Sequence, residues 1–87
     1  MLFGQNFPVS EYYRDRIIDA QTISRVGGWW TAVLLISDPS TQKPFLALYR
    51  WQLSEHTWKT RKSISFKNKK HIEDIIEILS KFKEQMG

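Results

Sequence analysis

Aromatic and basic side chains alternate through residues 49–66, YRWQLSEHTWKTRKSISF. Aromatic rings can stack on nucleobases and the cations between them can neutralise phosphates, so this mixture is typical of surfaces that bind single-stranded nucleic acid. The candidate contact residues lie in or just before this stretch: Lys43, Arg50, Trp51, Trp58, Lys59, Arg61 and Lys62. Two other interpretations stay open, because the tryptophans can belong to the core and the cations to an ordinary solvated face of a sheet.

Catalytic chemistry finds little support in the same chain. His56 and His71 are the only histidines, neither has a partner at metal-ligand spacing, and there is no cysteine. The carboxylates of Glu73, Asp74 and Glu77 fall on the expected solvent side of a helix, where they aid solubility rather than acid-base catalysis. No phosphate-binding glycine loop or nucleophile motif occurs. The sequence therefore predicts a protein that is not an enzyme and uses no metal or cofactor.

Length and composition indicate one folded, basic domain. The chain has 87 residues, of which 41% are hydrophobic and 14% aromatic. Its formal charge of +4 attracts polyanions, although it also fits a protein that is merely soluble and basic. The absence of cysteine favours a reducing compartment, and residues 1–10 lack the pattern of a signal peptide. Because no apolar run exceeds residues 32–36, we expect an intracellular protein that does not span a membrane.

Four strands are expected from apolar and β-branched runs separated by turn residues: residues 17–26, 29–36, 45–53 and 57–66. Gly27 and Gly28 supply the first turn, because glycine tolerates positive φ. Asp38 begins the next loop, where its side chain can accept a hydrogen bond from the backbone, and residues 54–56 form the last turn. Strands joined in this way form an antiparallel meander.

Side-chain alternation along each strand assigns residues to the two faces of the sheet. Residues 29–36 are apolar on both faces, which requires cover on both, and a second subunit is a natural candidate for part of it. Trp51 has the parity of an apolar strand face and leans toward the interior. In residues 57–66, Lys59 and Arg61 share the open face, and the last two apolar residues are expected to point at the core. The face opposite Lys59 carries Trp58, Lys62, Ile64 and Phe66.

The last element is an amphipathic helix over residues 69–86, for which Asn68 is a favourable N-cap. Its apolar stripe repeats at three- and four-residue spacing and comprises Ile72, Ile75, Ile76, Leu79, Phe82 and Met86, widened by Ile78. We therefore expect an α+β fold of order β-β-β-β-α, with a four-stranded antiparallel curved sheet followed by one C-terminal amphipathic helix.

The chain divides into an N-terminal arm, residues 1–14, and a single domain, residues 15–87. Phe3 and Phe7 can tuck onto the domain, and residues 10–16 fit either a short helical turn or the lead-in to the first strand. A second cationic cluster surrounds the start of the helix and comprises Lys67, Lys69 and Lys70. It fits phosphate contact at a helix N-terminus and a solvated turn equally well.

The second half of the chain resembles a known family. RKSISF, residues 61–66, resembles the basic strand of the positive cofactor four family of transcriptional coactivators, and YRW, residues 49–51, resembles its aromatic third strand. Asn68 sits where that family places its helix cap. The resemblance covers residues 17–86 in the order of elements and residues 49–79 in residue detail.

The resemblance implies a domain that binds unpaired DNA, with RNA as a second candidate, across its sheet with little sequence preference. It also implies a role in transcription or genome maintenance, with the transcription machinery as a partner. Trp51 matches the family's strand tryptophan, and Arg61 and Lys62 match its basic pair. The expected nucleic-acid contacts are Lys43, Arg50, Trp51, Lys59, Arg61 and Lys62. A homodimer is implied as well, and its expected interface comprises Trp30, Leu34, Ile75, Ile78 and Phe82.

Three features depart from the family pattern. Ser63 replaces the usual glycine, and the loop before the third strand offers Lys43 in place of an aromatic residue and several lysines. The family's sheet arginine aligns near Leu48, with Arg50 two residues further along. These departures favour weaker DNA binding or a different partner. The alternative hypothesis is therefore a protein-interaction module of the same fold.

Overall fold

One antiparallel sheet organises the molecule, with its strands in the order β1-β2-β3-β4. The computed structural model describes residues 7–87, so the expected contact of Phe3 lies outside the described residues. The elements are α1 (Glu11–Arg14), β1 (Ile17–Val26), β2 (Trp29–Ser37), β3 (Pro44–Ser54), β4 (Thr57–Phe66) and α2 (Lys69–Gln85). The predicted β-β-β-β-α order and α+β class are confirmed. The short helical turn, not a strand lead-in, precedes β1.

The turns form where residues tolerate or supply the required backbone. Gly27 and Gly28 between β1 and β2 have positive φ values of 62° and 79°. Glu55 and His56 between β3 and β4 also adopt positive φ. In the loop between β2 and β3, the Asp38 carboxylate accepts a hydrogen bond from the backbone N–H of Ser40 at 2.8 Å, as the sequence predicts.

The hydrophobic core lies on one face of the sheet, which we call the arm face because the N-terminal arm covers it. Alternate residues of β2 and β3 fill it, namely Trp30, Ala32, Leu34, Ile36, Phe45, Ala47 and Trp51. Val9 of the arm is buried among them, and Phe7 and Tyr13 pack against the cluster. The described part of the arm, residues 7–14, therefore supplies the cover that a two-faced apolar strand requires.

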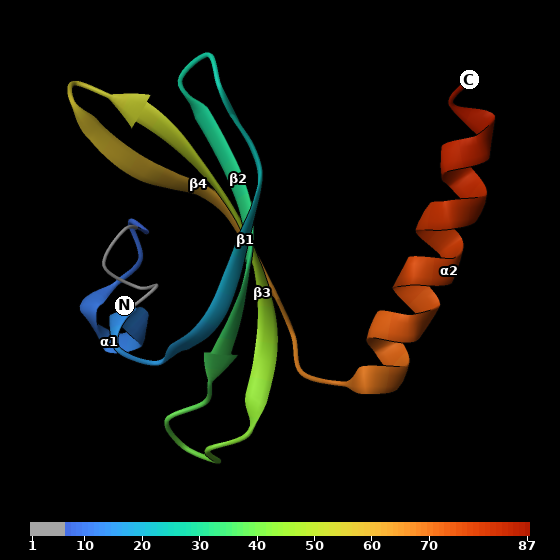
Figure 1. The fold of residues 1–87 in the computed structure, drawn as a ribbon, viewed down its shortest axis with the longest axis horizontal. Coiled ribbons are helices and arrows are strands. Elements are labelled where there is room, and N and C mark those ends of the chain that lie inside the picture. The colour runs from blue at the N-terminus through green and yellow to red at the C-terminus, as the bar shows by residue number, and fades with distance from the viewer. Residues whose placement is uncertain (1–6) are drawn as a thin grey trace.

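The opposite face, the helix face, carries Val33, Leu46 and Leu48 toward α2. Figure 1 shows that α1 and α2 lie on opposite sides of the sheet, and that α2 runs away from the strands toward its C-terminal end. Asn68 caps α2 as predicted, because its side-chain oxygen accepts a hydrogen bond from the His71 N–H at 3.1 Å. No residue of α2 is buried.

Two of the residues expected at a dimer interface face the arm instead. Trp30 is 4% exposed and Leu34 is fully buried, both beneath the chain's own arm. The expectation of Trp30 and Leu34 as contacts with a second subunit is therefore wrong for this conformation. Ile78 and Phe82 lie on the exposed side of α2, and Ile75 is half-buried.

Candidate functional site

Four cations from β3 and β4 gather on the helix face, near the turn that joins these strands: Arg50, Lys59, Arg61 and Lys62. Arg50 pairs with Lys62 across the two strands, and Gln52 pairs with Lys59. The Arg61 Nε–H donates a hydrogen bond to Gln52 Oε1 at 3.0 Å, which places its guanidinium over the same face. We call these four residues the cationic cluster.

A break in the strand register brings Lys62 into this cluster. Arg50 and Trp51 lie opposite Lys62 and Thr60, so Arg61 is an extra residue in β4. Such a bulge reverses the facing of every residue beyond it, because side chains alternate with a period of two. The uninterrupted alternation expected from the sequence is therefore wrong.

The consequence of the bulge is that Trp58 lies on the arm face, whereas Lys62, Ile64 and Phe66 lie on the helix face. Trp58 packs against the core, with its ring centroid 5.5 Å from that of Trp30. Ile64 is 49% exposed and Phe66 is half-buried toward α2, so neither belongs to the buried core.

The cationic cluster has no carboxylate partner within residues 7–87, where the ion pairs join Lys67 to Asp38 and Lys70 to Asp74. Four cations held close together without counter-charges create a positive potential that attracts polyanions. The second cationic cluster, at the start of α2, differs because two of its three lysines are paired. In the first of these pairs, the backbone N–H of Ser40 and the Lys67 ammonium hold the pKa of Asp38 below its usual value.

An aromatic ring that the sequence analysis did not single out accompanies the cationic cluster. Trp29 pairs with Gln52 in the sheet and is partly exposed on the helix face. The Arg50 guanidinium carbon lies 4.1 Å from the centroid of the Trp29 ring, in a cation–π contact. Aligning residues 29–36 with residues 45–53 as antiparallel partners could have revealed this contact. In that register, the side chains of Trp29 and Arg50 point to the same face of the sheet.

Two expected contact residues lie apart from the cationic cluster. Trp51 is fully buried on the arm face, where its ring stacks on Tyr49 at a centroid distance of 5.3 Å. Lys43 lies in the loop before β3, and the strand length between it and Arg50 is roughly 20 Å. The structure therefore groups Arg50, Lys59, Arg61 and Lys62, and leaves Trp51 and Lys43 out.

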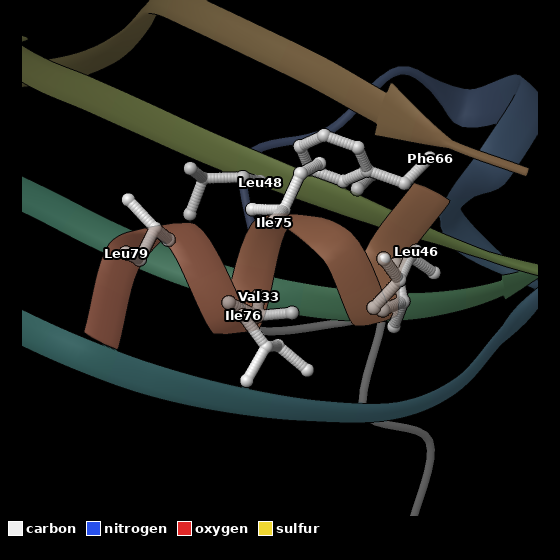
Figure 2. Close-up of a pocket in the computed structure, with 9 residues that line it drawn as sticks. Val33, Leu46, Leu48, Phe66, Ile75, Ile76 and Leu79 are labelled. Carbon is white, nitrogen blue, oxygen red and sulfur yellow. The ribbon is translucent and has the colours of Figure 1, made fainter. Parts of the chain in front are cut away.

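The other end of the helix face forms an apolar groove beneath α2. Its volume is about 230 Å³, and its lining is entirely apolar. Figure 2 shows Ile75, Ile76 and Leu79 of α2 opposite side chains of the strands, namely Val33, Leu46, Leu48 and Phe66. Ile76 and Leu79 remain 59% and 61% exposed, so the sheet covers the apolar stripe of the helix only in part.

The described residues also limit other kinds of site. Within residues 7–87, no three His, Asp or Glu side chains come together in a way that could hold a metal ion. Neither of the helices in that range is both long and apolar enough to cross a membrane. Glu77 and Glu73 of α2 are exposed, and Asp74 pairs with Lys70 as a surface ion pair.

Comparisons with known proteins do not inform the interpretation of this site. The chain matches no family model, no curated protein and no solved structure.

Proposed function

We propose that this protein binds single-stranded nucleic acid, with unpaired DNA as the main ligand, through the cationic cluster and the neighbouring ring of Trp29. One observation carries the proposal: four cations without an ion-pair partner in residues 7–87 share one face of the sheet with a partly exposed tryptophan. Cationic grooves with stacking rings bind single strands in this way. The resemblance to the positive cofactor four family supports the same ligand and a role in transcription regulation.

In this proposal, the Trp29 ring of β2 and the cations of β3 and β4 have separate tasks. A base that stacks on Trp29 takes the place that the Arg50 guanidinium now occupies, and the displaced Arg50 becomes free to contact a phosphate. Lys59 and Lys62 lie on the adjacent strand, and neighbouring strands are about 4.8 Å apart. The backbone of one strand of nucleic acid can therefore lie across both protein strands while a base stacks beside it.

Stacking and phosphate contacts explain the expected tolerance of sequence. Every base has a face that can stack, and phosphates are identical along the strand. The amide oxygen of Gln52, which lies beside the cationic cluster, already accepts a hydrogen bond from Arg61. We therefore propose binding with little preference among bases.

We further propose that the protein works as a homodimer whose contact includes α2. The stripe of Ile76, Leu79 and Phe82 is more than half exposed in the single chain, and Ile78 is 49% exposed. A helix with an apolar stripe usually buries that stripe against another element. Pairing two copies through α2 would cover these side chains and bring two cationic clusters into one particle.

Fluorescence anisotropy with a labelled poly-dT oligonucleotide tests the binding proposal, with a ribonucleotide strand in parallel. Affinity should fall between about 50 and 200 mM salt, with a log–log slope near −0.7 for each phosphate contact and near −3 for four. Arg61→Glu/Lys62→Glu should lower the affinity by at least about tenfold and flatten the slope. Light scattering on the same samples measures the mass of the particle.

The matched control is Lys70→Glu/Lys81→Glu, which changes the net charge equally on exposed positions of α2 that lie on the side opposite its apolar stripe. It should leave the affinity close to that of the wild type. Absence of binding at low salt, or equal loss in both double variants, would contradict the proposed site. A complex with a protein that is insensitive to salt and to the reversal of Arg61 and Lys62 would support the interaction module instead. That module is favoured by one observation, the apolar groove beneath α2.

A further inference from the structure

The arm face contains an aromatic surface that is separate from the cationic cluster. We call residues 7–14 the strap, and the surface beneath it comprises Trp30, Tyr49, Trp51 and Trp58. The Phe7 ring stacks on Trp30, with the centroids 5.2 Å apart, and lies 6.0 Å from the ring of Trp51. The surface therefore already holds a short peptide segment, Phe7-Pro8-Val9, by its aromatic and aliphatic side chains.

Among residues 7–87, apolar contacts and no hydrogen bonds join the strap to the strands. Its hydrogen bonds run within it, from Val9 to Phe7 and from Tyr13 and Arg14 to Ser10, or to Arg16 just beyond it, which donates to the carbonyls of Tyr12 and Tyr13. Among the described residues, the first hydrogen bond between this end of the chain and the sheet joins the Ser37 N–H to the Arg16 carbonyl, beyond the strap. Local opening therefore needs to break no backbone hydrogen bond of the sheet.

Among residues 7–87, one buried donor beneath the strap has no hydrogen-bond acceptor. The indole N–H of Trp51 is fully buried and has no acceptor among residues 7–87. By contrast, the indole N–H of Trp30 donates to Thr22 Oγ1 at 3.0 Å. A buried donor without a partner destabilises the state that buries it, so a segment that offers an oxygen to Trp51 would fit this surface better than the strap does.

We propose that the aromatic surface is a peptide-recognition site in which the strap is the resident occupant and an external segment of similar chemistry is the competing ligand. That ligand is an extended peptide with an aromatic residue, a proline and an aliphatic residue in succession, and a carbonyl oxygen that reaches the indole N–H of Trp51. The proposal is independent of nucleic-acid binding, because it concerns the opposite face of the sheet.

A peptide fits this surface better than a nucleic acid for two reasons on the arm face. Its present occupant is a peptide whose aromatic ring already packs on two tryptophans. The second reason is charge: Arg25 lies over the rings of Trp30 and Trp58, with its guanidinium carbon 4.1 Å and 5.4 Å from their centroids, whereas the four residues of the cationic cluster lie on the helix face.

Opening the strap in the full-length chain tests the proposal. Phe7→Ala/Val9→Ala removes the two side chains that anchor it, and the exposed Tyr12→Ala is the matched control within the same segment. A labelled peptide with the sequence of residues 7–14, FPVSEYYR, should bind the double variant at least about tenfold more tightly than the wild type. The wild type binds weakly because its own strap competes at an effective concentration near the millimolar range.

Two comparisons decide the result. The peptide APASEYYR, which lacks the Phe and Val side chains, should lose binding, and an oligonucleotide should not replace FPVSEYYR on the double variant. Equal binding of both peptides, no binding by a double variant whose far-UV circular dichroism is native, or preferred binding of the oligonucleotide to the opened face would each overturn the proposal.

Hydrogen exchange on the wild type gives a test that needs no variant to fold. The amides of Val9, Tyr13 and Arg14 should exchange by local opening, at least about tenfold faster than the Leu34 amide at the centre of the sheet. Exchange of the strap amides only together with Leu34 would show that the strap opens by global unfolding, and would overturn the proposal.

Discussion

The two faces of the sheet are built from the same strands, but the rest of the chain covers the arm face more fully than the helix face. On the arm face, the chain covers its own aromatic residues, and Ala32, Leu34, Ile36 and Trp51 have no exposed surface. On the helix face, α2 covers the apolar residues only in part, and the cationic cluster is open to solvent. One face therefore holds most of the buried core of the single chain, and the other leaves apolar and charged side chains exposed.

This difference places most of the stabilising contacts of a small domain on one face of its sheet. Burying apolar surface on the arm face contributes most of the folding free energy, because it removes large side chains from water. Residues of the helix face are free to serve contacts, since little of the core depends on them. Substitutions on the two faces should therefore have separable effects, and three predictions follow this division from the largest effect to the smallest.

The largest contrast concerns two leucines. Leu34→Ala should lower the free energy of unfolding by about 2–5 kcal/mol, because the site is fully buried and a cavity remains. Leu79→Ala should cost less than about 1 kcal/mol in the dilute chain, because that side chain is 61% exposed. Urea titrations followed by tryptophan fluorescence measure both.

Repeating the titrations at two protein concentrations, about a hundredfold apart, sharpens this contrast. If α2 joins two copies, the loss of unfolding free energy caused by Leu79→Ala grows with protein concentration. The loss caused by Leu34→Ala should be the same at both concentrations. A large loss for Leu79→Ala at the lower concentration would show that the helix face is already complete in one chain.

The second prediction compares the two most buried indoles of the arm face. Trp30→Phe removes a hydrogen bond to Thr22 and weakens the cation–π contact with Arg25, whereas Trp51→Phe removes a donor that has no acceptor in the described chain. Trp30→Phe should therefore cost about 2 kcal/mol more in unfolding free energy. Both variants lose the same ring volume, so each serves as the control for the other. Equal losses by thermal or urea unfolding would mean that the Trp51 indole is satisfied in solution.

The third prediction concerns the start of α2. Asn68→Ala removes the cap on the His71 N–H and should destabilise the helix by about 1 kcal/mol. Asn68→Asp keeps the acceptor and should behave like the wild type. Because the sheet covers α2 only in part, far-UV circular dichroism should register the loss before tryptophan fluorescence does. Coincident transitions in both signals would show that the helix and the sheet unfold as one unit.

Local signals in the sequence predicted the elements well. The bounds of β1 and β4 agree with the sequence prediction. Those of β2 and α2 differ by one residue at one end, and those of β3 by one residue at each end. Turn residues such as Gly27 and Gly28, and the cap at Asn68, act within a few positions of the chain. Their effect can therefore be recognised without knowledge of the fold.

Features that depend on contacts between distant segments were harder to predict, both near the cationic cluster and on the arm face. The bulge at Arg61 depends on how β4 pairs with β3, and a single extra residue reverses the facing of Lys62 and Ile64 relative to Trp58. The packing of Phe7 on Trp30 joins segments far apart in sequence. The role of Trp29 beside Arg50 likewise requires the register of β2 against β3. Long-range pairing determines all three, and periodicity within a strand carries no signal for it.

The irregular outer strand β1 limits how this protein can assemble. Its pairing with β2 shifts register at two places, between Ile17 and Asp19 and between Thr22 and Ser24. A free strand edge is otherwise a template on which further chains can add and grow into fibrils. Two interruptions within ten residues break the row of backbone groups that such growth requires. Assembly of further chains at this edge is thereby disfavoured.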